Sequence, residues 1–230
     1  MKNYTTLLFD ADETLLDFGR DETDALSRVL NECGIEKSEK NISAYKEINQ
    51  GLWKALERGE IDKPGLKKIR FKLFFDKIGY TPKEDPLVIN ERYLSYLGEG
   101  GNLLAGAKEL ITELHSNGYS LYIVTNGIEK TQRNRLTKAG ILPFFTELFV
   151  SEAIGYQKPR KEYFDYVLAH IGEKDKSKVL LIGDSLTSDI KGAVNAGITC
   201  AWLRHDPAAD SGELKPDYII DSISQVKILL

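Results

Sequence analysis

The 230-residue sequence contains few of the residues that bind soft metals or form cross-links: two cysteines, three histidines and one methionine. Cys33 and Cys200 lie far apart and outside any metal-ligand spacing, so we expect reduced, mostly buried thiols. The two cysteines therefore say little about function. His115, His170 and His205 belong to none of the strand-end motifs described below.

The sequence also lacks long hydrophobic runs and an excess of basic residues. Its longest apolar stretches fall well short of the ~18 residues that a membrane span needs, and the N-terminus lacks the apolar stretch of a signal peptide. The net charge of -4 is not the basic footprint of a nucleic-acid binder. We therefore expect a cytoplasmic protein with neither a membrane nor a nucleic-acid polymer as partner. The 42% hydrophobic content allows a substantial core, in one domain or two small ones.

A short apolar run at 4–9 stops abruptly at two carboxylates, Asp10 and Asp12. The run is too short for a stable helix and favours a strand buried on both faces, as in parallel sheets. Ligands of open α/β sheets bind outside the carboxyl ends of strands, and side chains two residues apart on a strand point the same way. The run therefore predicts that both acids enter one site. The alternative is a solvated turn that caps the next helix.

Residues 17–99 show helical periodicity without a strand. Apolar positions at helical spacing predict four successive helices, near 25–33, 42–56, 64–78 and 85–97. Pro64 opens the third, at a position where proline is tolerated. We expect a compact all-helical insert of about 80 residues.

From Leu103 the pattern alternates between strands and helices. We expect strands near 119–124, 148–150, 179–182, 198–203 and 218–220, and helices near 105–117, 129–139, 163–171, 188–196 and 223–229. This alternation predicts an α/β fold with a doubly wound parallel sheet. The sheet would be built from residues 1–16 and 100–230 and interrupted by a helical cap domain at 17–99, inserted where it can cover the strand ends.

Polar residues of complementary kinds follow four of the predicted strands. They are Asp10 with Asp12, Thr125 with Asn126, Lys158, and Asp184 with Asp189. Each alone could be a turn or a helix start. Together, the carboxylates would repel one another by roughly 4 kcal/mol per pair at ~4 Å unless a cation joined them, and oxygen-only ligands favour Mg²⁺. A hydroxyl, backbone N–H groups and an ammonium would suit a phosphoryl group.

The same residues resemble the four motifs of the haloacid dehalogenase (HAD) superfamily of phosphatases. The matching strings are Asp10-x-Asp12-x-Thr14, the hydroxyl residue Thr125, Lys158-Pro159, and Gly183-Asp184-Ser185-x-x-x-Asp189. Their order matches across essentially the whole chain, and the helical insert resembles the type-1 caps of that superfamily. The resemblance implies a Rossmann-like core.

The resemblance also implies roles for the acids. Asp10 would be the nucleophile that forms an aspartyl-phosphate, and Asp12 would protonate the leaving group and then activate water. Mg²⁺ would be bound by Asp10, the backbone carbonyl of Asp12 and Asp184, with Asp189 binding directly or through water.

The remaining motif residues would bind the phosphoryl group. Thr125 and the backbone of Asn126 would contact its oxygens, and Lys158 would neutralise the nucleophile and the transferring group. Other phosphatase chemistries lack their signatures here: neither cysteine starts a Cys-x₅-Arg loop, and no Arg-His-Gly occurs.

A more detailed resemblance concerns the substrate. Strings such as Phe9-Asp10-Ala11-Asp12-Glu13-Thr14-Leu15, Asn49-Gln50-Gly51-Leu52-Trp53 and Thr125-Asn126-Gly127 resemble the HAD branch of pyrimidine nucleoside 5′-monophosphatases, which act on dUMP, UMP, dTMP and noncanonical pyrimidine nucleotides. The hypothesis that follows places Phe18, Asn49 and Trp53 beside the base. Alternatively, Trp53 and Phe18 only pack within the protein and Asn49 only faces solvent.

Other functions remain open at this point. A HAD phosphatase or phosphomutase for sugar phosphates would share the catalytic residues, whereas a haloalkanoic acid dehalogenase would need neither Asp12 nor Mg²⁺. From a different class, a non-enzymatic phospho-aspartate signalling module could use similar residues, but it carries no 80-residue cap. The resemblance further implies that the cap opens and closes, with hinges near 17–20 and 97–102, where Gly19, Gly98, Gly100 and Gly101 permit bending.

Overall fold

The computed structural model describes residues 4–230, which divide into two compact units. The core unit comprises 4–18 and Gly101–Leu230, and the helical unit comprises Gly19–Gly100. The chain thus changes unit two residues later than expected on the first passage and one residue later on the second. Both passages lie within the glycine-containing segments that the sequence identified as hinges.

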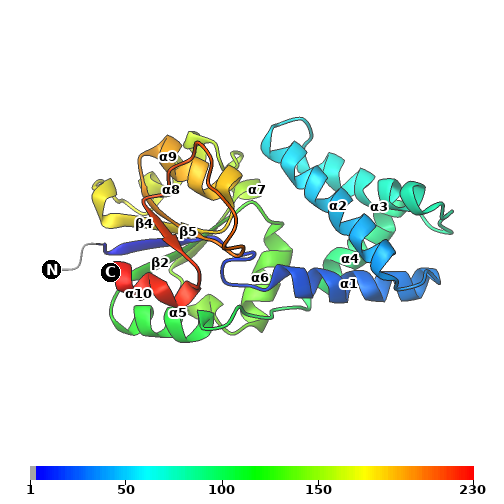
Figure 1. Ribbon diagram of the computed structural model, residues 1–230, viewed down its shortest axis with the longest axis horizontal. Coiled ribbons are helices and arrows are strands. Elements are labelled where there is room, and N and C mark those ends of the chain that lie inside the picture. Colours follow the sequence, from blue (N-terminus) through cyan, green and yellow to red (C-terminus); the bar gives the residue numbers. More distant parts are fainter. Residues whose placement is uncertain (1–3) are drawn as a thin grey trace. The chain divides into compact units, whose positions relative to one another are not determined.

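The core unit is built on a six-stranded sheet whose strands are all parallel (Figure 1). Its strands are β1 (Thr6–Phe9), β2 (Ser120–Thr125), β3 (Glu147–Val150), β4 (Val179–Gly183), β5 (Thr199–Leu203) and β6 (Tyr218–Ile220). Their order is β3-β2-β1-β4-β5-β6. This is the doubly wound arrangement that the sequence predicts, and its winding direction reverses between β1 and β4.

Helices cover both faces of this sheet because successive side chains of each strand point to opposite faces. Leu7 and Phe9 belong to one buried cluster, together with residues of α5 (Ala107–Ser116), α6 (Glu129–Lys138) and α10 (Val226–Leu229). Leu8 belongs to the other, with residues of α8 (Lys161–His170) and α9 (Lys191–Ala196). Figure 1 shows α5 and α10 on one side of the sheet and α8 and α9 on the other. Burial on both faces explains the apolar run 7–9 of β1.

Several short elements escape prediction from periodicity. They are the helix α7 (Ser151–Ile154), the single turns η1 (Leu142–Phe144) and η2 (Lys176–Lys178), and the π-helical turn η3 (Leu186–Ile190). The expected helix at 223–229 consists of the turn η4 (Ile223–Gln225) followed by α10. The expected helix at 188–196 consists of η3 followed by α9. Ser185 caps this turn, since its hydroxyl accepts a hydrogen bond from Ser188 N at 3.2 Å. A wide turn at this point carries Asp189, in keeping with the frequent use of π turns at functional sites.

The helical unit contains α1 (Phe18–Cys33) from Gly19 onward, together with α2 (Glu39–Glu57), α3 (Lys63–Ile78) and α4 (Pro86–Gly98). Side chains of Ser38, Asp62 and Asp85 cap the last three by accepting backbone hydrogen bonds. Gly79 ends α3 in the left-handed conformation with φ 68°, which glycine adopts without steric cost. An aromatic cluster joins α2, α3 and α4, with ring centroids of Tyr45, Phe71, Phe74 and Tyr93 as close as 5.4 Å.

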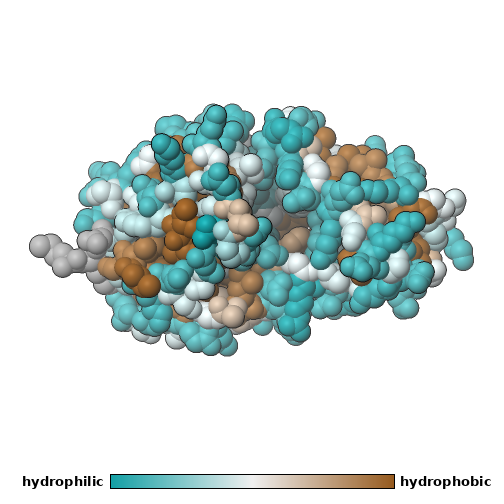
Figure 2. Space-filling view, viewed as in Figure 1, coloured by the Kyte–Doolittle hydropathy of each residue, from teal (hydrophilic) through white to brown (hydrophobic). Residues whose placement is uncertain are grey.

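On the face drawn in Figure 2, hydrophilic residues predominate and hydrophobic residues form separate smaller areas, as the 29% charged content would lead one to expect. Cys200 is buried, Cys33 is only partly buried, and both thiols are free. Among residues 4–230, no helix combines the length and apolar character of a membrane-spanning segment.

Candidate active site

The first and fourth motifs meet where the sheet reverses its winding. Asp10 directly follows β1, and Asp184 directly follows β4, which pairs with β1 in parallel. Asp10 N donates to Ile182 O at 2.9 Å, so the hydrogen-bonding of the two strands extends to the acid itself. Ligands of doubly wound sheets bind at such switch points. The topology thus brings together residues that are separated by 174 positions in the sequence.

Lys158 lies at the centre of the site with its ammonium fully enclosed. Its Nζ donates to Asp10 Oδ1 at 2.6 Å, to Asp189 Oδ1 at 2.6 Å and to the Val124 carbonyl at 2.8 Å. An ammonium has three hydrogens, and these three acceptors use all of them. The ammonium is therefore held from three directions. Lys158 is only 1% exposed, so these bonds replace the contacts with water that burial removes.

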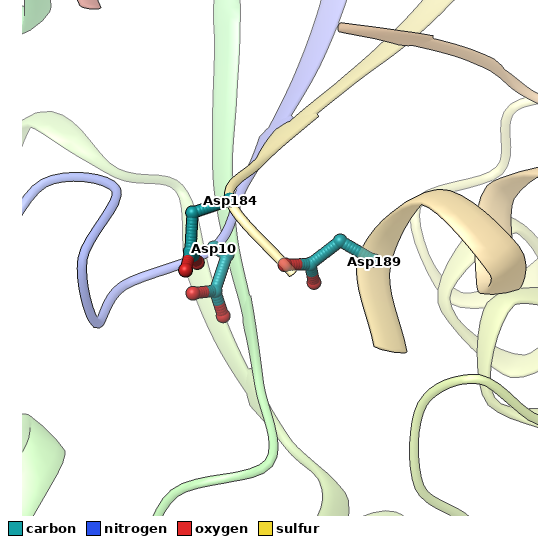
Figure 3. Close-up of side chains that lie close together, drawn as sticks. All are labelled: Asp10, Asp184 and Asp189. Atoms are coloured by element: carbon teal, nitrogen blue, oxygen red, sulfur yellow. The ribbon is translucent and has the colours of Figure 1, made fainter. Parts of the chain in front are cut away.

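Three carboxylates converge beside this ammonium. Asp10, Asp184 and Asp189 each place an oxygen within 4.8 Å of the others, and Figure 3 shows their carboxylates turned toward one another. Asp189 is also fixed by Ser185 N, which donates to its Oδ2 at 3.1 Å. Gly183 leaves the space for this acid, since a Cβ on Gly183 would lie 2.5 Å from Asp189 Cγ. Asp184 is less constrained, accepting a 3.4 Å hydrogen bond from the Thr14 hydroxyl.

Burial and mutual repulsion make these acids hard to ionise together. Burial raises the pKa of Asp10 to about 7; the Lys158 charge opposes this increase, and Asp189 and Asp12 add to it. Burial, followed by the charges of Asp10 and Asp189, raises the pKa of Asp184. For Lys158, burial disfavours the charged form, but Asp10 and Asp189 outweigh it and raise the pKa of the ammonium. The lysine is therefore a permanent cation.

The donor set fits a divalent hard cation. One ammonium faces three carboxylates, so ionisation of all three leaves an excess of negative charge in a largely buried site. The donors are oxygens, which Mg²⁺ prefers over the nitrogen and sulfur ligands typical of zinc. Asp12 contributes no carboxylate to this group. A bound Mg²⁺ would offset the mutual repulsion of these acids, which adds to the effect of burial in raising the pKa of Asp10 and Asp184.

The second motif provides a hydroxyl and an amide in fixed orientations. Thr125 Oγ1 accepts hydrogen bonds from Gly127 N at 3.0 Å and from Gln132 Nε2 at 3.2 Å. Both lone pairs of the hydroxyl are thus engaged, and its hydrogen is left to donate to an anion. The Asn126 side chain binds the main chain of Lys158 through two 2.9 Å hydrogen bonds. Sequence reasoning assigned Asn126 only a backbone role and missed this side-chain contact.

The Asp12 carboxylate is bound by two residues of α6 that sequence reasoning also missed. Gln132 Nε2 donates to Asp12 Oδ2 at 2.5 Å, and Arg135 NH1 donates to Asp12 Oδ1. Both side chains are almost fully buried. Their spacing of three residues on a helix that follows the second motif could have drawn attention to them, since such residues share a helix face.

The loop that carries Asp12 has a further support. Glu13 adopts a positive φ of 54°, a conformation that residues other than glycine rarely adopt. His205 Nε2 lies 2.5 Å from the Glu13 carbonyl and therefore carries the hydrogen of this bond. Sequence reasoning gave His205 no role in the site. The structure shows instead that this exposed histidine contacts the loop between Asp12 and Thr14.

The three residues expected beside the base lie in different settings. Asn49 is buried in the helical unit, where Nδ2 donates to Glu22 Oε1 at 2.7 Å and Oδ1 accepts from Arg70 NH1 at 3.2 Å. Trp53 is partly buried and packs against the apolar cluster between α2 and α3. Phe18 belongs to the core unit, and its ring centroid lies 5.5 Å from the guanidinium carbon of Arg135. Asn49 therefore does not simply face solvent.

The chain is similar to known proteins over most of its length. A family model described as haloacid dehalogenase-like hydrolase matches residues 4–197. The pyrimidine 5′-nucleotidase PynA of Streptococcus pneumoniae is 38% identical over 95% of this chain and 92% of PynA, and the pyrimidine 5′-nucleotidase YjjG of Escherichia coli is 31% identical over 97% and 96%. A crystal structure of the HAD-hydrolase YfnB from Bacillus subtilis bound to magnesium matches with a TM-score of 0.92 and 40% identity, over 100% of this chain and 99% of that one.

Proposed function

The chain belongs to the haloacid dehalogenase-like hydrolase family, and from this premise we propose that it is a Mg²⁺-dependent phosphatase of pyrimidine nucleoside 5′-monophosphates. As a member of a hydrolase family it is an enzyme, which sets aside the non-enzymatic signalling module. One observation carries the proposal: Asp10 contacts the Lys158 ammonium, while Asp12, two residues further along the chain, is held separately by a side chain of α6.

The reaction proceeds in two displacements at phosphorus. A carboxylate oxygen of Asp10 forms a bond to phosphorus while the ester P–O bond breaks. The leaving oxygen keeps the electron pair of the broken bond and receives a proton from Asp12. Asp12, now a carboxylate, removes a proton from water as the water oxygen attacks phosphorus. The bond between phosphorus and Asp10 breaks, phosphate leaves, and Asp10 is a carboxylate again. A dehalogenase would need no acid at position 12.

The remaining residues bind and neutralise the phosphoryl group. The Thr125 hydroxyl and the Asn126 backbone N–H would donate to its oxygens, and the fixed Lys158 ammonium would stabilise the charge that develops as the group transfers. Asp10, Asp184, Asp189 and the backbone carbonyl of Asp12 would hold Mg²⁺. When bound, the ion would draw charge from the phosphoryl oxygens and keep the neighbouring acids ionised.

The proposed selectivity for pyrimidine nucleotides is based on the relatives. We assign it mainly to the helical unit, which would act as a cap. PynA and YjjG are both pyrimidine 5′-nucleotidases, and they match nearly the whole chain, including the helical unit. Phe18, Asn49 and Trp53 are proposed to contact the base. Asn49 has one amide hydrogen and one carbonyl lone pair beyond its bonds to Glu22 and Arg70. The Phe18/Gly19 and Gly100/Gly101 junctions are the proposed hinges of cap closure.

The test is phosphate release from a matched panel with Mg²⁺ or with EDTA. The panel contains dUMP, UMP, dTMP, purine monophosphates and hexose phosphates. We expect faster phosphate release from pyrimidine nucleotides than from the other substrates. EDTA should abolish this release, and Asp10→Asn should show none. A preference for hexose phosphates would keep the catalytic mechanism and overturn the nucleotide assignment. Undiminished turnover by Asp10→Asn would overturn the mechanism itself.

A further inference from the structure

The Asp12 carboxylate is held at both of its oxygens by one face of α6. Gln132 Nε2 donates to Oδ2 at 2.5 Å, and Arg135 NH1 donates to Oδ1. The two donors lie three residues apart on the helix, which places them on the same face. Two hydrogen bonds to different oxygens fix the plane of a carboxylate, whereas a single bond would let it rotate. Each oxygen keeps a further lone pair for a proton or a water molecule.

Gln132 also connects this carboxylate to the phosphate-binding hydroxyl. Its second amide hydrogen is donated to Thr125 Oγ1 at 3.2 Å, and its Oε1 accepts from Arg135 NH1 at 3.3 Å. The amide orientation is thus determined by partners on both sides. Gly127 permits this arrangement, since a Cβ there would lie 2.3 Å from Gln132 Nε2. Thr125 Oγ1 also accepts from Gly127 N at 3.0 Å, so this hydroxyl keeps a fixed partner when Gln132 is replaced.

The burial of Arg135 is not explained by stability alone. Arg135 is 1% exposed and Gln132 2%, whereas the side chain of Asp12 is 30% exposed. Enclosing a guanidinium costs several kcal/mol, and an apolar residue in its place is often no less stable. The exposed part of Asp12 leaves access for a leaving oxygen or a water molecule. The arrangement is a rigid, buried support behind a partly accessible acid.

We infer that Gln132 and Arg135 are positioning residues that orient the Asp12 carboxylate for both of its proton transfers. The inference rests on the proposed function, in which Asp12 gives a proton to the leaving oxygen and later takes one from water. Neither residue contacts the transferring phosphoryl group in this account. Their loss should therefore slow the steps that need the Asp12 proton and spare a step that does not.

Leaving-group chemistry separates these steps. The sugar oxygen of a nucleotide leaves as an alkoxide and needs a proton, whereas the phenolate of p-nitrophenyl phosphate leaves without one. Formation of the aspartyl-phosphate should thus depend on Asp12 for dUMP but not for the aryl ester. Hydrolysis of the aspartyl-phosphate needs Asp12 as a base with either substrate. Rapid mixing with p-nitrophenyl phosphate resolves the two steps as a burst and a steady rate.

The variants are Gln132→Leu and Arg135→Met, with Asp12→Asn as reference and Arg133→Met as control. Arg133 lies on the same helix, is half exposed and pairs only loosely with Glu129, at 3.4 Å. For both variants we expect kcat on dUMP to fall about 10- to 100-fold, short of the loss of the acid itself, with KM nearly unchanged. The aryl burst should keep its rate within about threefold and be followed by a slowed steady phase. Arg133→Met should behave as the wild type.

Two results would overturn the inference. One is wild-type kinetics in both Gln132→Leu and Arg135→Met; the other is an equal loss of the aryl burst and of dUMP turnover, which indicates a general structural defect. Gln132→Leu removes no charge, so it provides the test if Arg135→Met does not fold. Asp12→Asn distinguishes the two levels of the account. If Asp12→Asn loses the aryl burst and dUMP turnover equally, the proposed role of Asp12 fails. If Asp12→Asn loses dUMP turnover but keeps the aryl burst, and the Gln132 and Arg135 variants do not, only the inference about those two residues fails.

Discussion

The side chain of Asn126 and the main chain of Lys158 are joined by two hydrogen bonds. Lys158 N donates to Asn126 Oδ1 and Asn126 Nδ2 donates to Lys158 O, each at 2.9 Å. This pairing ties the loop after β2 to the segment that precedes α8. It sets the position from which the Lys158 ammonium reaches Asp10 and Asp189. Asn126 thus acts on the active site through the backbone of its cation.

Asn126→Ala removes both bonds and is expected to lower kcat about 100-fold with a smaller change in KM. The reason is that a misplacement of about 1 Å in a catalytic group can cost this much. Steady-state phosphate release at saturating Mg²⁺ measures it. The matched control is Asn195→Ala, because Asn195 is exposed and donates one 3.0 Å bond to the neighbouring Pro159 carbonyl. A normal kcat in Asn126→Ala would show that Lys158 is positioned without it.

Lys158→Met should abolish turnover and also lower the free energy of unfolding of the metal-free protein. Removing the ammonium leaves Asp10 and Asp189 without their buried counter-charge, a change that typically costs about 3–5 kcal/mol. The loss should be largest near pH 8 and smaller near pH 5, where Asp10 can bind a proton instead. Urea unfolding at both pH values measures it. Lys161→Met, on an exposed i,i+4 pair with Asp165, should change stability by less than about 0.5 kcal/mol.

The metal-free protein should lose stability as the pH rises from about 4 to about 7. Burial raises the folded-state pKa of Asp10 to about 7, so in this range the folded state binds more protons than the unfolded state. The raised pKa of Asp184 acts in the same direction. Mg²⁺ would bind the ionised acids, so its stabilising effect should grow over the same range. Thermal unfolding with Mg²⁺ and with EDTA tests this prediction. A difference in melting temperature between the two conditions that does not change with pH would contradict it.

Asn49→Leu should destabilise the protein by about 1–3 kcal/mol, whatever its effect on substrates. The change leaves the buried polar atoms of Glu22 and Arg70 without the partner that connects them. Gln50→Leu, at an exposed position of the same helix, is the control. The ratio of kcat/KM for dUMP and a purine monophosphate, measured at a temperature where the variant is folded, tests its proposed contact with the base. An unchanged ratio would remove Asn49 from the base site.

The sequence was sufficient for the strands and for Asp10, Thr125 and Asp184 at their ends, whereas Lys158 lies beyond α7, eight residues after β3. Runs such as Val179–Ile182 are apolar because both sheet faces are covered, so the acids that end them stand out. The partners of those acids were not predictable in the same way. Asp12 and Arg135 are 123 residues apart, and nothing in local periodicity pairs them. Asn126 followed the expected motif, but its side-chain role depends on a loop 32 residues away. The buried environment of Asn49 likewise depends on contacts with other helices.

The most direct test of the account is the location of the phosphoryl group during turnover. The enzyme is mixed with dUMP and Mg²⁺, quenched in acid within the first turnovers, and digested for peptide mass spectrometry. The account predicts one phosphoryl group on the peptide that contains Asp10, absent in Asp10→Asn and retained longer in Asp12→Asn, which lacks the base for its hydrolysis. Continued turnover with the phosphoryl group on another residue, or an unchanged rate in Asp10→Asn, would contradict the claim that Asp10 is the nucleophile.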